Sequence, residues 1–89
     1  MANFTEDMLI DLYKTLVSLE SPEDCKILLD DLCTKKEVEN MAQRIRAAKL
    51  LMKGETYDKV TEKTGIASAT LARVSTAVKY GEGYKKILK

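Results

Sequence analysis

Apolar residues recur at helical spacing along the whole chain, and no segment alternates between apolar and polar positions. A first helix is expected over residues 5–19, with Thr5 as its N-cap and acidic residues in its first turn. Its apolar stripe consists of leucines that are three or four positions apart, namely Leu9, Leu12, Leu16 and Leu19.

Two further helices are marked by the residues at their ends. Ser21 is expected to cap a second helix that has Pro22 at its first position. A third helix starts at Thr34, where Glu37 completes a capping box, and ends before Gly54. Its apolar seam runs over four turns, which is typical of a helix packed centrally in a bundle or a dimer. The seam consists of Val38, Met41, Ile45, Ala48 and Met52.

The pattern then changes to two short helices, over residues 56–63 and 68–79, joined by a turn around Gly65. This arrangement describes a helix-turn-helix, and glycine supplies the left-handed conformation that a sharp turn requires. Ser68 is expected to cap the second helix, and Thr64 stands where a larger apolar residue is usual. The residues expected to face inward are Val60, Ile66, Leu71, Val74 and Val78.

The outer face of the 68–79 helix is small, polar or basic. Small residues permit close approach to base edges, whereas hydroxyls and cations bind phosphates. Many helical hairpins with a glycine turn do not bind DNA, and a basic stripe is often only a solvated face. The candidate base-reading residues are Ser68, Ala69 and Ala72, and the candidate phosphate-binding residues are Thr70, Arg73, Thr76, Lys79, Lys49 and Lys53.

Charge is distributed unevenly along the chain. The 89 residues are 45% apolar and 33% charged, as expected for one globular domain, and the net charge is +1. That sum alone argues against a nucleic-acid partner. However, residues 1–33 hold two basic and eight acidic residues, a net charge of −6, whereas residues 34–89 hold 13 basic and six acidic residues, a net charge of +7. Such asymmetry suggests contact with nucleic acid or a membrane.

Several classes of protein are disfavoured by what the sequence lacks. With no histidine, two cysteines and no phosphate loop or nucleophile elbow, we expect no metal, no cofactor and no enzymatic activity. No apolar run approaches the roughly 20 residues of a membrane span, and the acidic N-terminus is unlike a signal peptide. On one helix Cys25 and Cys33 would lie about 12 Å apart, too far for a disulfide. We expect both to be small buried residues of a cytoplasmic protein.

Three segments of the chain, DLCTKKEVENMAQR, AKLLMKGETYDKV and TGIASATLARV, resemble the tryptophan repressor family. The resemblance is closer to small bacterial TrpR-like proteins of the YerC/YecD type and covers roughly residues 8–84. It implies an all-α fold of about five helices in an intertwined homodimer, with dimerisation helices over 1–54, a helix-turn-helix over 56–80 and a short basic tail over 81–89. It also implies a transcriptional repressor that binds a two-fold-related operator on double-stranded DNA.

The resemblance further implies a possible effector pocket. Two arginines on either side of a planar ring and its carboxylate would be chemically sensible. Val74, however, stands where the family has a glycine that leaves room for the ligand, and Ala77 stands where a serine holds its amino group. We therefore expect that L-tryptophan is not the ligand. Alternatively, Arg44 pairs with an acid of the N-terminal half and Arg73 contacts a phosphate. The residues that match the family's pocket are Thr34, Arg44, Thr70 and Arg73.

Three functions remain open. Asp58 and Thr61 stand where the repressor has basic residues, so the operator should differ from the repressor's. The leading hypothesis is a dimeric, sequence-specific DNA-binding regulator without enzymatic activity. One alternative is a helical protein-interaction adaptor that keeps the fold but does not bind DNA. The other is a regulator gated by a small effector other than tryptophan.

Overall fold

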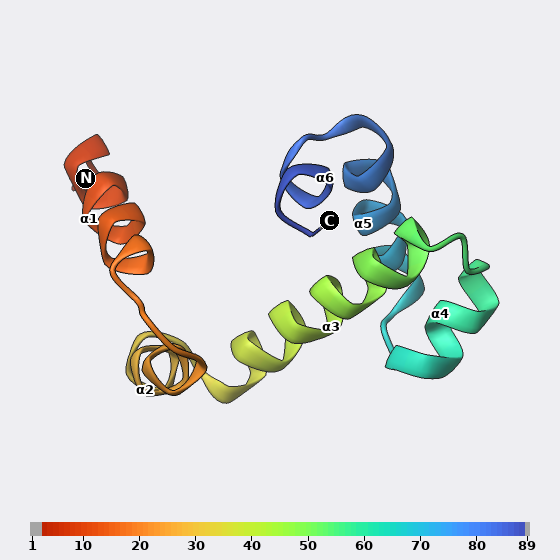
Figure 1. The fold of residues 1–89 in the computed structure, drawn as a ribbon, viewed down its shortest axis with the longest axis horizontal. Helices are drawn as coiled ribbons and strands as arrows, with labels where there is room; N and C mark the ends of the chain where they lie inside the picture. Colours follow the sequence, from red (N-terminus) through yellow and green to blue (C-terminus); the bar gives the residue numbers. More distant parts are fainter. Residues whose placement is uncertain (1–2, 89) are drawn as a thin grey trace. The chain divides into compact units, whose positions relative to one another are not determined.

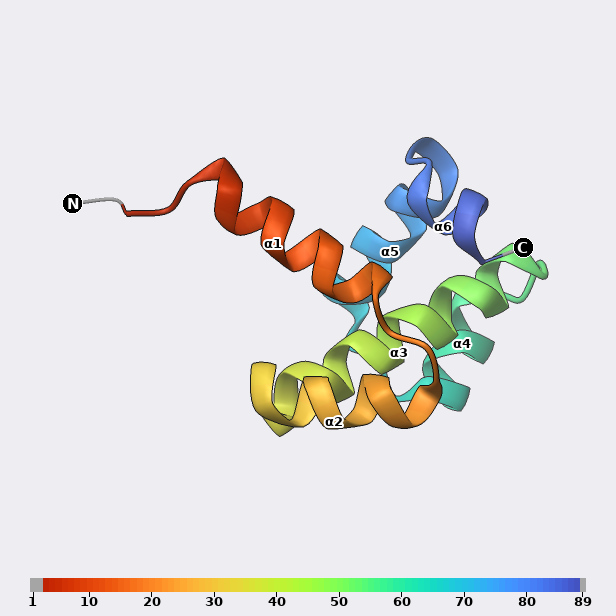
Figure 2. The ribbon, with the colours of Figure 1, turned by 60° about the vertical axis from the view of Figure 1, so that its left-hand side comes forward.

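The computed structural model describes residues 3–88, and every regular element within this range is a helix (Figures 1 and 2). The chain divides into two units, Met1–Thr34 and Lys35–Lys89. The all-α expectation is confirmed, but six helices are present within the described range rather than about five. The additional helix, α6 (Gly83–Ile87), lies in the segment that the sequence predicts to be a short tail.

The N-terminal unit consists of α1 (Glu6–Val17) and α2 (Pro22–Leu32). Ser21 caps α2 as predicted, because its Oγ accepts a hydrogen bond from the Asp24 amide at 3.1 Å. Thr5 occupies the N-cap position of α1, but its side chain makes no capping hydrogen bond. Neither helix contains a buried residue. The large apolar side chains that remain exposed on them are Met8, Ile10, Leu12, Tyr13, Leu16, Val17, Ile27 and Leu32.

The long helix α3 (Lys35–Met52) ends in a Schellman motif, in which two amides bond back to carbonyls of the last turn. The Glu55 amide donates to the Leu50 carbonyl at 3.1 Å, and the Gly54 amide donates to the Leu51 carbonyl at 3.0 Å. Gly54 has φ +92°, which confirms that it ends this helix. Of the predicted apolar seam only Ala48 is buried, since Met41, Ile45 and Met52 are 36%, 44% and 37% exposed.

The predicted helix-turn-helix consists of α4 (Tyr57–Thr64) and α5 (Ser68–Tyr80). Gly65 has φ +71°, the left-handed conformation expected of it. The polar Thr64 also serves the turn, because its hydroxyl donates to the Val60 carbonyl at 2.7 Å and accepts from the Ile66 amide at 3.2 Å. The prediction that Ser68 caps α5 is wrong. The N-cap is Ala67, which offers no side-chain acceptor, and Ser68 is the first helical residue.

The core of the C-terminal unit lies where α3 contacts both α4 and α5. Both views show these two helices beside the C-terminal half of α3 (Figures 1 and 2). Tyr84 and Leu88, in and just after α6, pack on the same core and are half-buried, as is Val78. The inward-facing prediction is therefore confirmed for the helix-turn-helix, and the buried core residues are Ala47, Ala48, Val60, Ile66, Leu71 and Val74.

Gly65→Ala should lower the free energy of unfolding by about 1 kcal/mol, because an L-residue is strained at a positive φ. Crowding adds little to this cost, since the nearest atom to an added Cβ is Gln43 Nε2 at 3.8 Å. Urea unfolding monitored by circular dichroism measures the loss. Gly65→Asn is the matched control, since asparagine adopts this conformation more easily and should lose less. Equal losses in the two variants would contradict the conformational explanation.

Candidate nucleic-acid interface and adjacent pocket

The outer face of α5 is solvent-accessible along its length, whereas Leu71, Val74 and Ser75 on the opposite face are buried. No aspartate or glutamate occurs between Ser68 and Tyr80, so this face carries only neutral and positive groups. Among the DNA-binding candidates on α5, Thr70 is half-buried, and the exposed ones are Ser68, Ala69, Ala72, Arg73, Thr76 and Lys79.

One of these candidates is already engaged within the helix. The Thr76 hydroxyl donates to the Ala72 carbonyl at 3.0 Å, so its oxygen remains free only as an acceptor. To donate to a phosphate, Thr76 must change its side-chain rotamer. Arg73 and Lys79 form no ion pair with a carboxylate anywhere in residues 3–88. These two cations are therefore the groups on α5 best placed for phosphate contact.

Three lysines act on the carboxylate of Glu55, which lies in the connection between α3 and α4. The Lys63 ammonium donates to both carboxylate oxygens of Glu55, at 3.1 and 2.8 Å. This hydrogen bond lowers the pKa of Glu55, and the positive charges of Lys63, Lys59 and Lys53 lower it further against the opposing effect of desolvation. Lys63 is thus engaged by Glu55, whereas the predicted phosphate ligands Lys49 and Lys53 are exposed and form no ion pair within the described range.

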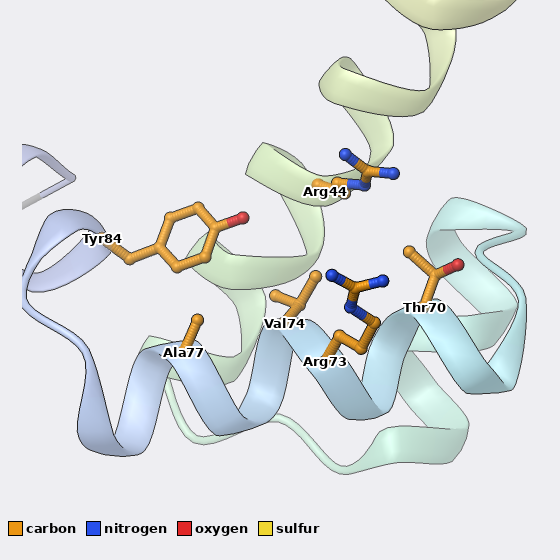
Figure 3. A pocket seen from close by; sticks show the side chains of 6 residues that line it. All are labelled: Arg44, Thr70, Arg73, Val74, Ala77 and Tyr84. Carbon is orange, nitrogen blue, oxygen red and sulfur yellow. The ribbon is translucent and has the colours of Figure 1, made fainter. Parts of the chain in front are cut away.

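A pocket of about 240 Å³ opens between α3, α5 and α6. Figure 3 shows the guanidinium of Arg44 on α3 and that of Arg73 on α5 beside the same space, with the Tyr84 ring of α6 reaching in from the other side. Val74 and Ala77 lie along α5, between the two arginines on one side and Tyr84 on the other. The six residues that line the pocket are Arg44, Thr70, Arg73, Val74, Ala77 and Tyr84.

The pocket brings together three of the four predicted effector residues. Arg44, Thr70 and Arg73 line it, whereas Thr34 is not among its lining residues and belongs to the N-terminal unit. Arg44 makes no ion pair with any carboxylate of residues 3–88, and no acidic residue lines the pocket. The site can therefore bind an anion without displacing an internal carboxylate.

Tyr84 is the lining residue that the sequence analysis missed. Its signal is the spacing of Tyr84 and Leu88, which are four positions apart and fall on one face of a helical turn. The sequence analysis instead describes residues 81–89 only as a short basic tail.

Within the described part of the chain no group of three or more aspartate, glutamate, cysteine or histidine side chains is arranged to hold a metal ion. The same residues include no helix long and apolar enough to cross a bilayer. Cys25 and Cys33 are free thiols, and both are half-buried rather than buried as the sequence analysis expects.

Comparisons with known proteins agree on one family. The family model for the Trp repressor protein matches residues 7–89. The uncharacterized protein YerC of Bacillus subtilis (strain 168) is 40% identical over 70 residues, which are 79% of this chain and 67% of YerC.

Two crystal structures have closely similar folds. A Trp repressor candidate from Staphylococcus aureus is 34% identical, with a TM-score of 0.89 over 92% of this chain and 83% of that one. A TrpR-like protein from Eubacterium eligens ATCC 27750 is 31% identical, with a TM-score of 0.88 over 92% of this chain and 86% of that one.

The ion pair between Glu55 and Lys63 should make stability depend on pH in a definite direction. Because the pKa of Glu55 in the folded chain lies below its ordinary value of 4.5, the pair stabilises the fold above that value. The contribution is lost as the pH falls through the lowered pKa. Glu55→Gln should therefore be less stable than the unmodified chain at pH 7, and the difference should be smaller at pH 3, where the Glu55 carboxylate begins to be protonated in the unfolded and then in the folded chain.

Urea titrations at pH 7 and pH 3 measure this difference. Lys63→Gln provides the matched variant, because it removes the other partner of the same pair. The double variant should lose no more stability than either single variant at pH 7, as expected for two groups whose effects act through one interaction. Additive losses, or an equal difference at both pH values, would contradict this account.

Proposed function

Because this chain belongs to the Trp repressor family, we propose that it is a sequence-specific DNA-binding transcriptional regulator that acts as a cytoplasmic homodimer and represses its target genes. The observation that carries the proposal is the outer face of α5. This face is exposed and free of acidic groups, while the opposite face is fixed on α3 by the core.

The proposed binding mode assigns different tasks to different residues of α5. Ser68, Ala69 and Ala72 are small enough to let the helix approach base edges in the major groove. Arg73 and Lys79 neutralise phosphates on either side of the groove. The remaining phosphate contacts are supplied by Thr70, Thr76, Lys49 and Lys53.

Homodimerisation is supported by the apolar surface that the N-terminal unit leaves uncovered. Neither α1 nor α2 buries a residue, and Leu12, Leu16 and Leu32 remain exposed. A unit of 34 residues is too small to form a core of its own. On this proposal the helices of residues 1–54 pack against those of a second copy, and the two α5 helices meet one face of a two-fold-related operator.

A second candidate function, gating by a small effector, is favoured by the pocket beside α5. Arg44 and Arg73 face it without carboxylate partners among the described residues, so an anionic group would find two charge-assisted donors there. L-tryptophan is a poor candidate, because the Val74 side chain occupies space along the wall and Ala77 provides no hydroxyl for an amino group. The effector is expected to be a different molecule.

Arg73→Ala should weaken DNA binding at least tenfold, because each chain loses an exposed cation from the outer face of α5. The dependence of log K on log salt should also flatten by about 0.9 for each phosphate that is no longer neutralised, or about 1.8 for a dimer. Fluorescence anisotropy with duplexes recovered by in vitro selection measures both quantities. Lys26→Ala is the control, because Lys26 is a cation of α2 that pairs with Asp30 and lies outside the proposed interface.

The same variants separate the regulator from a protein-interaction adaptor. An adaptor would show no salt-dependent DNA binding, and Arg73→Ala would leave its partner binding unchanged. The regulator would be ruled out if no duplex were selected from random DNA. The adaptor would be supported if, in addition, Arg73→Ala and Lys26→Ala both left the binding of a protein partner unchanged.

Effector gating predicts that a small anion stabilises the fold. A ligand present at 100 times its Kd adds about 2.7 kcal/mol, enough to raise Tm by several degrees in a thermal-shift screen of organic acids and nucleotides. L-tryptophan should give no shift. Arg44→Ala should abolish any stabilisation that is found, whereas Arg46→Ala on the same helix should retain it. A screen without a stabilising compound would reject gating but leave DNA binding unaffected.

A further inference from the structure

The C-terminal helix α6 folds back onto α5 instead of continuing away from it as a tail. Its return begins at Gly81, whose amide donates to the Ala77 carbonyl at 2.8 Å and ends α5. The chain then turns through Glu82 into α6. Three features of this return bear on the position of α5.

The first feature is the lack of space at Gly81. A Cβ built there would lie 2.8 Å from the Ala77 carbonyl oxygen, closer than real Cβ atoms come to such a group. Gly81 has φ −89°, which any residue adopts, so its requirement for glycine is one of space alone. At Gly83, two positions further on, an added Cβ would have no atom within 4 Å.

The second feature is a side-chain bond from α6 to the end of α5. The Lys85 ammonium donates to the Lys79 carbonyl at 2.8 Å. Carbonyls in the last turn of a helix have no partner within the helix, and a cation is favourable at this negative end. Lys85 therefore ties α6 to the C-terminal turn of α5.

The third feature is how α6 is seated. Tyr84 and Leu88 both pack on the core formed by α3, α4 and α5. Tyr84 also forms one wall of the pocket that contains Arg44 and Arg73 (Figure 3). Leu88 lines a second cavity with Lys49 and Lys53. Residues 83–88 thus reach from α5 to basic residues at the C-terminal end of α3 and just beyond it.

We propose that α6 is a strap that fixes the C-terminal half of α5 against α3 and so positions Thr76 and Lys79 for DNA phosphates. Gly81 and Lys85 are positioning residues, since they act on these side chains through the backbone of α5. The proposal rests on the proposed DNA-binding function. The proposal adds that α5 is held in place by a segment outside the helix-turn-helix, namely α6.

Gly81→Ala and Gly83→Ala form a matched pair in the full chain. In Gly81→Ala we expect amide hydrogen exchange at residues 78–81 to accelerate at least tenfold, while residues 71–74 keep their protection. We also expect affinity for the selected duplex to fall about fivefold or more. Gly83→Ala should change neither quantity, because its Cβ meets no atom and alanine favours a helix.

Lys85→Met and Lys86→Met form a second pair, which keeps the test informative if Gly81→Ala does not fold. Lys85→Met should accelerate exchange at residues 78–81 and weaken DNA binding, Lys85→Arg should restore both, and Lys86→Met should leave exchange unchanged. If Lys85 instead contacts DNA directly, its removal flattens the salt dependence by about 0.9 per phosphate without changing exchange. That result would overturn the strap.

Other outcomes are equally decisive. Equal exchange in Gly81→Ala and Gly83→Ala would show that α6 does not hold α5. Faster exchange with unchanged DNA affinity would show that α6 only stabilises the fold, and the positioning role would be rejected. If the unmodified chain binds no duplex, the proposed function and the positioning role both fail, but exchange still reports whether α6 anchors α5.

Discussion

Two consecutive alanines on α3, Ala47 and Ala48, have no exposed surface, and the packing of the helix-turn-helix depends on them. Their short side chains let neighbouring helices approach α3 closely, and the space is filled by Val60 from α4 and by Leu71 and Val74 from α5. Because these contacts bury the inner face of α5, DNA could meet only the outer face of this helix. Burial of one face therefore determines which residues of α5 are available to DNA.

The division of charge follows the division into structural units. The excess of negative charge ends at Cys33, and the N-terminal unit ends one residue later at Thr34. Screening limits charge effects to about 8–10 Å at physiological salt, so the charges close to α5 count for more than the sum over the whole chain. The overall charge of +1 therefore says little about DNA binding. What matters is the local absence of acids on α5, together with Glu55 as the internal partner of Lys63.

Local sequence signals predicted most of the fold. Ser21, Gly54 and Gly65 act through the backbone within a few residues of themselves, so their roles could be inferred from the sequence. The missed helix α6 is only five residues long and has glycine at its first position, Gly83, and it is stabilised by contacts of Tyr84 and Leu88 with the core. The position of Tyr84 at the pocket depends on the same contacts. Sequence periodicity alone does not show which surface such a short segment will meet.

Arg73 connects the two proposed activities of the C-terminal unit. Arg73 is exposed on the outer face of α5 and also lines the pocket beside Arg44. Its guanidinium group has five donors in a fixed plane, so an anion in the pocket would fix its orientation at the edge of the DNA surface. A ligand that favours the orientation of Arg73 used for DNA would raise the affinity for DNA, and DNA would raise the affinity for that ligand by the same factor. Coupling between pocket and operator therefore requires no large conformational change in this fold, because a single side chain contributes to both sites.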